Sequence, residues 1–285
     1  MSNLKIVKMN YLALFWFSIF TVILLSCDQK VKEEAWEDDT LPKPKMLLEG
    51  NESDVAHLIT KVEMIDQQAD TSYRKVRSLR WEYSSDSVGE VVEVTAFVNK
   101  EGYPVKIVEA YYEDANQRQG EKNYYYEKET LIATADLYDE WKHIEGGMMY
   151  YDQVFYENEE VTYARHKEAK EVDMLSDVEW EEKQTPTVLN PERALAVLGQ
   201  TTPFETHFLS IIESNNSLYL LLGEPKDGDR YVTVLRVEDV NVPFIQDLLK
   251  NRTTYRYRPI AVQYEIVGGN GAPEFRVMRG AKWMD

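Results

Sequence analysis

The densest group of side chains suited to ligand binding lies at residues 252–258. The segment reads Arg-Thr-Thr-Tyr-Arg-Tyr-Arg and interleaves cations with aromatic rings, in a chain whose formal net charge is −18. Guanidinium groups form bidentate hydrogen bonds with carboxylates and phosphates, and aromatic rings stack on bases and sugars. The pattern indicates a ligand-binding segment whose candidate residues are Arg252, Tyr255, Arg256, Tyr257 and Arg258.

A structural role is the competing interpretation of this segment, and it is the one we favour. The segment directly precedes a strand predicted at 260–267, so it can form the amphipathic start of that strand. Its arginines would then pair with nearby acids such as Asp247.

Recognisable signatures of catalysis are missing from the sequence. There is no H-E-x-x-H pair and no G-x-S-x-G elbow. The glycine-rich run at 268–271 lies between two predicted strands, whereas a phosphate-binding glycine loop opens a helix. The run Asp227-Gly228-Asp229 offers too few ligands for a calcium loop. We therefore predict a protein that is not an enzyme and that has no metal site and no cofactor. The histidines are scattered, at His57, His143, His166 and His207.

The single cysteine, Cys27, follows a basic start and an apolar run from Tyr11 to Leu25. A signal peptide combines a basic flank, an apolar core of about 7–15 residues and a small residue at the cut. A membrane-spanning helix needs about 20 apolar residues. Because charged residues follow Cys27 at once, a buried role for its thiol is disfavoured.

The residues Leu24-Leu25-Ser26-Cys27 resemble the lipobox of bacterial lipoproteins. The resemblance covers only this N-terminal segment. It implies cleavage between Ser26 and Cys27, lipid on the Cys27 sulfur and an acylated new amine, which together anchor a protein stably to a membrane. It places the exported protein in the cell envelope, with the outer membrane favoured. Asp28 resembles an inner-membrane retention signal and the acidic stretch after it resembles a surface-export signal, so the leaflet stays open.

The negative charge is concentrated in the N-terminal part of the chain. Residues 28–200 carry 20 basic and 39 acidic side chains, whereas residues 201–285 carry 10 and 11. This charge disfavours nucleic acid as a partner. Solubility and self-repulsion are the explanation that we favour, and a surface for a cationic partner or divalent ions is the alternative.

The first half of the mature chain predicts a helix followed by an antiparallel β-meander. Apolar residues at 55, 58, 59, 62 and 65 form one helical stripe, with Ser53 or Asp54 as its cap. Alternating residues at 90–99 and 105–112, separated by a turn, predict a hairpin. Further strands are expected at 122–127, 130–137, 149–156 and 161–164. Two similar turns, at 126–129 and 156–159, suggest a repeated hairpin.

The last 85 residues predict three strands, a helix and two strands. The strands are expected at 206–212, 217–222, 231–237, 260–267 and 275–283, with the helix at 242–249. This order resembles the OB-fold, a five-stranded, partly open barrel that binds oligonucleotides and oligosaccharides. A two-layer α+β sheet is the alternative arrangement.

The sequence thus predicts a mainly β protein of the α+β class, with an N-terminal helix, an antiparallel meander and a small OB-like barrel. The predicted divisions are a signal peptide at 1–26, a tether at 27–50, a helix-and-sheet domain at 51–170, an acidic linker with a short helix at 171–200 and the OB-like domain at 201–285.

The expected function is that of a non-catalytic binding or assembly module of the cell envelope. Its partners would be the membrane, through the lipid on Cys27, and a cationic envelope protein or a cell-wall glycan, with no nucleic acid. Two alternatives stay open. One is a hydrolase of glycan or lipid that uses paired carboxylates, and the other is a carrier of an apolar ligand.

Overall fold

A computed structural model describes residues 51–85, 88–142, 146–225, 231–269 and 272–284. Residues 44–285 group into one compact unit. The predicted lipobox, including Ser26 and Cys27, and the tether predicted at 27–50 lie outside the described residues, as do His143 and the loop around Asp227.

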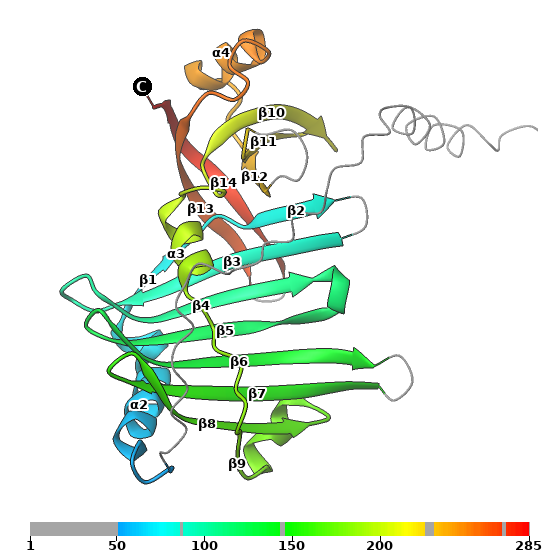
Figure 1. The fold of residues 1–285 in the computed structure, drawn as a ribbon. Coiled ribbons are helices and arrows are strands. Elements are labelled where there is room, and N and C mark those ends of the chain that lie inside the picture. Colours follow the sequence, from blue (N-terminus) through cyan, green and yellow to red (C-terminus); the bar gives the residue numbers. More distant parts are fainter. Residues whose placement is uncertain (1–50, 86–87, 143–145, 226–230, 270–271, 285) are drawn as a thin grey trace, which may run out of the picture. The chain divides into compact units, whose positions relative to one another are not determined.

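The protein is mainly β, as predicted, and the strands within the described ranges form a single sheet of 14 strands that is open rather than closed. Figure 1 shows these strands side by side in the order β10-β11-β12-β2-β3-β4-β5-β6-β7-β8-β9, with β1 on β3, β14 on β12 and β13 on β14. The strands are β1 (Arg74–Arg77), β2 (Trp81–Ser85), β3 (Val88–Val98), β4 (Pro104–Glu113), β5 (Arg118–Glu127), β6 (Thr130–Lys142), β7 (Gly146–Glu157), β8 (Glu160–Ala169), β9 (Glu181–Glu182), β10 (His207–Ser214), β11 (Ser217–Gly223), β12 (Tyr231–Val237), β13 (Ile260–Gly269) and β14 (Ala272–Trp283).

The antiparallel meander predicted after the first helix is confirmed from β2 to β8. The separate OB-like barrel is not confirmed, because β12 pairs with β2 of the meander and the sheet stays open. The boundary between domains at 51–170 and 201–285 stays a prediction, although strands of both regions pair through β2 and β12.

The two predicted repeat hairpins, β5–β6 and β7–β8, share their local geometry. Each has a two-residue turn, with a register shift just before it at Tyr125/Tyr126 and at Phe155/Tyr156. Lys128 has φ 60° in the first turn, and Asn158 and Glu159 have φ 52° and 67° in the second. Turns with positive φ match the right-handed twist of paired strands.

Glycine at position 159 is expected to stabilise the protein. The left-handed conformation costs a residue with a Cβ about 1–2 kcal/mol, and Asn-Gly is a preferred pair for this turn. We expect Glu159→Gly to raise the free energy of unfolding in urea by about 1 kcal/mol. Glu129→Gly, at the matching position of the other hairpin, is the control. Residue 129 has no positive φ, so an equal gain there would contradict the explanation.

The helix α2 (Ala56–Ser72) covers one face of the meander. Its predicted apolar stripe is confirmed, because Leu58, Val62 and Ile65 are buried against strand residues such as Phe155. The predicted cap is wrong: Val55 is the cap residue, and the Asp54 carboxylate instead accepts a hydrogen bond from the Asn51 backbone at 3.0 Å.

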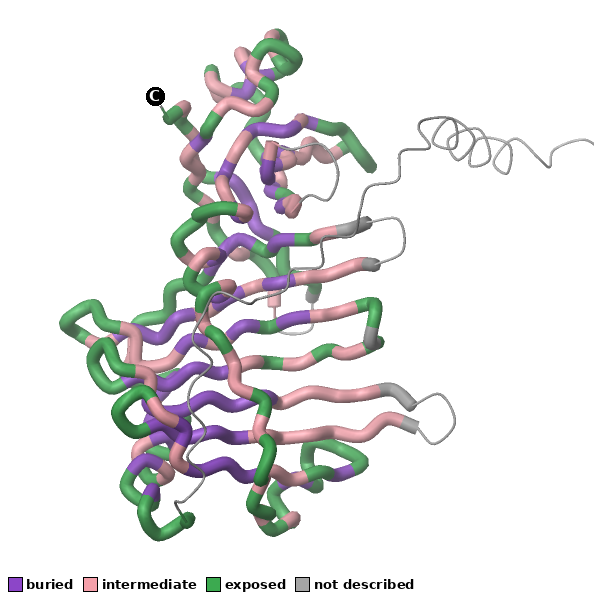
Figure 2. The backbone as a smooth tube through the Cα atoms, in the orientation of Figure 1, coloured by how far each residue is buried: buried purple, intermediate pink, exposed green. Residues whose placement is uncertain are grey.

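A second segment covers the opposite face of the sheet. After β8, the chain passes through η2 (Val172–Asp177) and β9, then crosses in front of β4–β8 to reach α3 (Glu192–Gly199), as Figure 1 shows. The Tyr124 hydroxyl donates to the Asn190 carbonyl at 3.2 Å, and Lys183 bonds Asp152 at 2.6 Å. In β5–β8 most buried positions lie toward the ends joined by the β5–β6 and β7–β8 turns, and positions toward the opposite ends are largely half-buried (Figure 2).

The largest core cluster lies between this face and the C-terminal strands. Trp81 of β2 is fully buried and meets the Phe204 ring edge-on at 5.9 Å. The cluster joins meander residues such as Val92 to C-terminal residues such as Leu220 and Leu235. The remaining described elements are η1 (Asp114–Asn116) and α4 (Pro243–Asn251), the latter close to the predicted helix.

Candidate ligand-binding site

The predicted arginine–tyrosine segment lies between α4 and β13. The structure brings Tyr255 and Arg258 together around Trp283, with ring centroids 4.9 Å apart for the two aromatics and the Arg258 guanidinium 4.8 Å from the indole. The Tyr255 hydroxyl donates to Asp247 at 2.8 Å, and this hydrogen bond raises the pKa of Tyr255. The acid that we predicted as an arginine partner thus binds a tyrosine.

The other three candidate residues of the segment are Arg252, Arg256 and Tyr257. Arg252 and Arg256 are exposed, and the Arg256 guanidinium lies 4.8 Å from the Tyr257 ring. Tyr257 has φ 70°, unusual for a bulky residue, and its backbone N–H donates to the Phe208 carbonyl at 2.6 Å. The segment therefore fastens β13 to β10. The predicted ligand role of its arginines stays a prediction.

A hollow of about 270 Å³ lies on the outward face of β11 and β12. Its lining comes from four strands and the residue before β2, which are far apart in the sequence. The pairing of β12 with β11, β2 and β14 assembles it. The lining residues are Arg80, Glu82, Tyr219, Val234, Arg236, Glu274, Phe275 and Arg276.

Aromatic side chains flank Arg236 in this hollow. Tyr219 is its register partner on β11, and the Phe275 ring of β14 lies 5.9 Å from its guanidinium. Val234 and Phe275 leave 44% and 43% of their surface exposed, so the hollow has an apolar wall open to solvent. Alternation explains the orientation: Leu220 and Leu235 point into the core, which turns Tyr219 and Arg236 outward.

The acids around the hollow are each paired with an arginine other than Arg236. Buried Arg276 pairs with Glu93 of β3, and exposed Arg80 pairs with Glu82 at 3.2 Å. Arg77 pairs with Glu274 at 3.5 Å. Among the described residues, Arg236 has no carboxylate within ion-pairing distance, although it is half-buried. The site therefore has one guanidinium in excess, set between aromatic rings.

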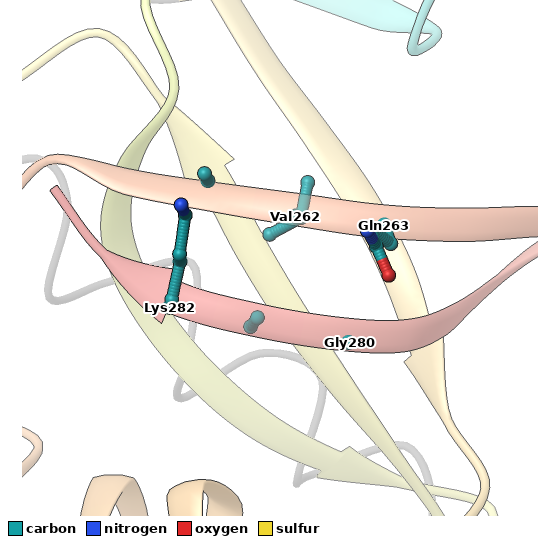
Figure 3. Close-up of a pocket in the computed structure, with 6 residues that line it drawn as sticks. Val262, Gln263, Gly280 and Lys282 are labelled. Carbon is teal, nitrogen blue, oxygen red and sulfur yellow. The ribbon is translucent and has the colours of Figure 1, made fainter.

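A second hollow, of about 290 Å³, lies over the β13–β14 hairpin. Figure 3 shows it along the two strands, with Lys282 and Gln263 among its labelled side chains. The remaining lining is small or apolar: Ala261, Val262, Gly280 and Ala281. Its one charged side chain is the exposed Lys282 and no aromatic residue lines it, so the hollow around Arg236 is the stronger candidate.

A buried charge cluster fixes α3 to the meander. The Arg193 Nε donates to Glu109 Oε1 at 2.7 Å, and the same guanidinium contacts Glu90. Glu109 is 1% exposed, and burial raises its pKa to about 6, against the opposing effects of Lys122 and a hydrogen bond from Tyr124. These paired carboxylates are held by Arg193, which leaves them poorly placed to act on a substrate.

The raised pKa of Glu109 predicts a pH dependence of stability. Between about pH 4.5 and 6 the folded protein holds a proton that the unfolded chain has lost, so stability falls as pH rises through this range. Relative to Glu109→Gln, the wild type should gain about 2 kcal/mol on acidification from pH 7 to pH 4, because one pKa unit is worth about 1.4 kcal/mol. Urea denaturation of both proteins at several pH values measures the difference. A wild type that loses stability relative to Glu109→Gln on acidification would show that the Arg193 pairing dominates.

Sequence reasoning predicted three of the four strands that line the hollow, β11, β12 and β14, but it predicted neither β2 nor the lining residues. The alternation in 217–222 and 231–237 could have shown that Tyr219 and Arg236 face outward together. No local signal brings Arg80 or Phe275 to them, because that depends on pairings of β12 with β2 and β14.

No protein-family model, curated protein or solved structure matches this chain. Within the described part of the chain, none of the helices has the length and apolar character needed to cross a membrane. The same residues contain no group of three acids, histidines or cysteines arranged to hold a metal ion.

Proposed function

We propose that this chain is a membrane-anchored lipoprotein of the cell envelope that acts as a non-catalytic binding or assembly module. The outer membrane is the location that we favour. The anchor rests on the lipobox-like residues Leu24 to Cys27. The binding role rests on one observation, the hollow in which Arg236 has no acidic partner among the residues that the structure describes and lies between Tyr219 and Phe275. Its partner would be an envelope protein or a cell-wall glycan.

We also propose that residues 201–285 form an OB-like unit whose strands are part of the larger sheet. The order β11-β12-β14-β13 and the parallel pairing of β12 with β14 support this. The bridge between His207 and Pro259 brings the start of β10 to the start of β13, as closure of such a barrel requires. In this arrangement the hollow lies on the second and third strands, the face on which OB-folds bind ligands.

The anchor is tested by labelling cells with an alkyne analogue of palmitate. The wild type should incorporate the label and fractionate with membranes, and Cys27→Ser should do neither. Separation of inner and outer membranes then tests the favoured location. An unlabelled wild type would overturn the lipoprotein assignment.

The binding role is tested by a photo-crosslinking residue placed in intact cells at Val234, inside the hollow. The control is the same residue at Met64, which is similarly exposed on α2. A discrete adduct at position 234 that is missing at position 64 is the expected result. Identical adducts, or none, at the two positions would contradict a binding role for this face.

A further inference from the structure

We infer that the hollow around Arg236 binds an anionic sugar, that is, a pyranose ring bearing an acidic group. This inference rests on the proposed binding function and specifies the ligand of that site. It combines three properties of the hollow: its size, its surplus guanidinium and its exposed aromatic wall.

The size of the hollow suits a single ring. Its volume of about 270 Å³ is slightly below the range for pockets that hold drug-sized ligands, which is about 300–1,000 Å³. The lining combines charged and polar side chains with the exposed apolar side chains of Phe275 and Val234. A sugar ring has the same two characters, because its hydroxyl groups project outward while its C–H groups form apolar faces.

The surplus cation selects an acidic ligand. Arg236 is half-buried without a carboxylate partner among the described residues, so part of its hydration is lost without compensation. A carboxylate or phosphate would supply bidentate hydrogen bonds of the strong, charge-assisted kind. Arg80 can contribute as well, because its pair with Glu82 is exposed, at 51% and 58% of the two side chains, and such pairs are weak.

The aromatic residues explain why the ligand should carry a ring. Aromatic faces are electron-rich, so they attract the slightly positive C–H face of a pyranose. Phe275 exposes a ring beside Arg236, and Tyr219 lies on the other side of that arginine. A ligand can therefore stack on Phe275 while its acid group reaches Arg236.

Single-stranded nucleic acid also combines rings with negative charge, but the surroundings disfavour it. Glu82 and Glu274 lie at the hollow, and the chain has a formal net charge of −18. Arg80 and Arg276 are already paired with acids, so a polyphosphate backbone would find few free cations to neutralise it. One acidic sugar needs only one or two arginines.

The test measures binding to the full folded protein by NMR titration in about 20 mM salt, where electrostatic attraction is weakly screened. Galacturonate and galactose differ only in the acid group at C6, and acetate supplies the acid group without the ring. Tetragalacturonate is added as a ligand that presents several acidic rings, and galactose 6-phosphate tests phosphate as the acid group. We expect the acidic sugars to bind at least about tenfold more tightly than galactose or acetate.

The variants assign the binding to this hollow. Arg236→Gln should weaken acidic-sugar binding by about tenfold or more, and Phe275→Ala should weaken it several-fold. Arg279→Gln is the matched control, because Arg279 lies on the same strand as Phe275 but is paired with Glu238 and Glu265 at 2.8 Å. It should leave binding unchanged.

Several results would overturn the inference. These are failure of every acidic sugar to bind at 10 mM, equal binding of galactose, or unchanged binding by Arg236→Gln. Tighter binding of octathymidylate, lost in Arg236→Gln, would replace the sugar with nucleic acid. Binding by galactose 6-phosphate alone would support the inference and identify phosphate as the acid group. A specific protein adduct at Val234 without sugar binding would overturn this inference and leave the proposed binding function standing.

Discussion

Arg193→Met is expected to lower the free energy of unfolding by about 3–5 kcal/mol. Arg193 of α3 contacts both Glu109 and Glu90, and Glu109 is almost completely buried. Removing the cation leaves the Glu109 carboxylate buried without its partner. Losing one partner of a buried ion pair is strongly destabilising, because the remaining charge is uncompensated. Urea denaturation followed by far-UV circular dichroism measures the loss.

A double variant and a control separate charge from packing. Adding Glu109→Gln to Arg193→Met should recover part of the lost stability, because the double variant no longer buries that unpaired charge. Arg279→Met removes an arginine whose side chain is 42% exposed, and the expected cost is below about 1 kcal/mol. Equal costs for Arg193→Met and Arg279→Met would contradict the structural role of the buried cluster.

Trp81→Ala is expected to cost about 3–5 kcal/mol, which is typical of removing a large buried aromatic side chain. Trp81 has no exposed surface, and β2 pairs with β3 on one side and β12 on the other. Its core cluster contains residues from both the meander and the C-terminal strands. The two regions should therefore unfold together in one transition. In Trp81→Ala this whole transition should move to a lower urea concentration.

Hydrogen exchange at increasing urea concentration tests this cooperativity, because it follows the β6 and β11 amides separately. Both sets should lose protection at the same urea concentration, and at a lower one in Trp81→Ala. Trp180→Ala is the control, since Trp180 is only half-buried and stacks near Arg165 and Lys167. Independent unfolding of 51–170 and 201–285, with only one of them shifted, would favour two separate domains instead.

The strands that could be predicted are those with an alternating apolar pattern or a short apolar run. The prediction for 231–237 matches β12, and those for 217–222 and 260–267 fall within a few residues of β11 and β13. By contrast, β1 reads Arg-Lys-Val-Arg and is exposed throughout, so it lacks an alternating apolar pattern. A short strand of this kind forms because a neighbouring strand, here β3, offers backbone hydrogen bonds. The local sequence gives no indication of which strand that is.

The arrangement of strands in space was harder to predict than their positions. The pairing of Tyr231 with Tyr83 joins residues nearly 150 positions apart, and no turn signal points to it. The same limit applies to the site. Local composition drew attention to Arg256 and Tyr257, whereas the hollow depends on Arg236 and Phe275, which only the pairing of β12 with β14 brings together.

The short strand β9 has a consequence for self-association. It ends the sheet beyond β8 with only Glu181 and Glu182, both exposed. An unpaired strand edge is a template on which another chain can add a strand, and short, charged edge strands discourage this. Two copies that met along β9 would bring four carboxylates together and gain few hydrogen bonds. This acidic edge should protect the open sheet from strand-to-strand aggregation, and the protection would matter most among the crowded copies that the proposed membrane anchor would create.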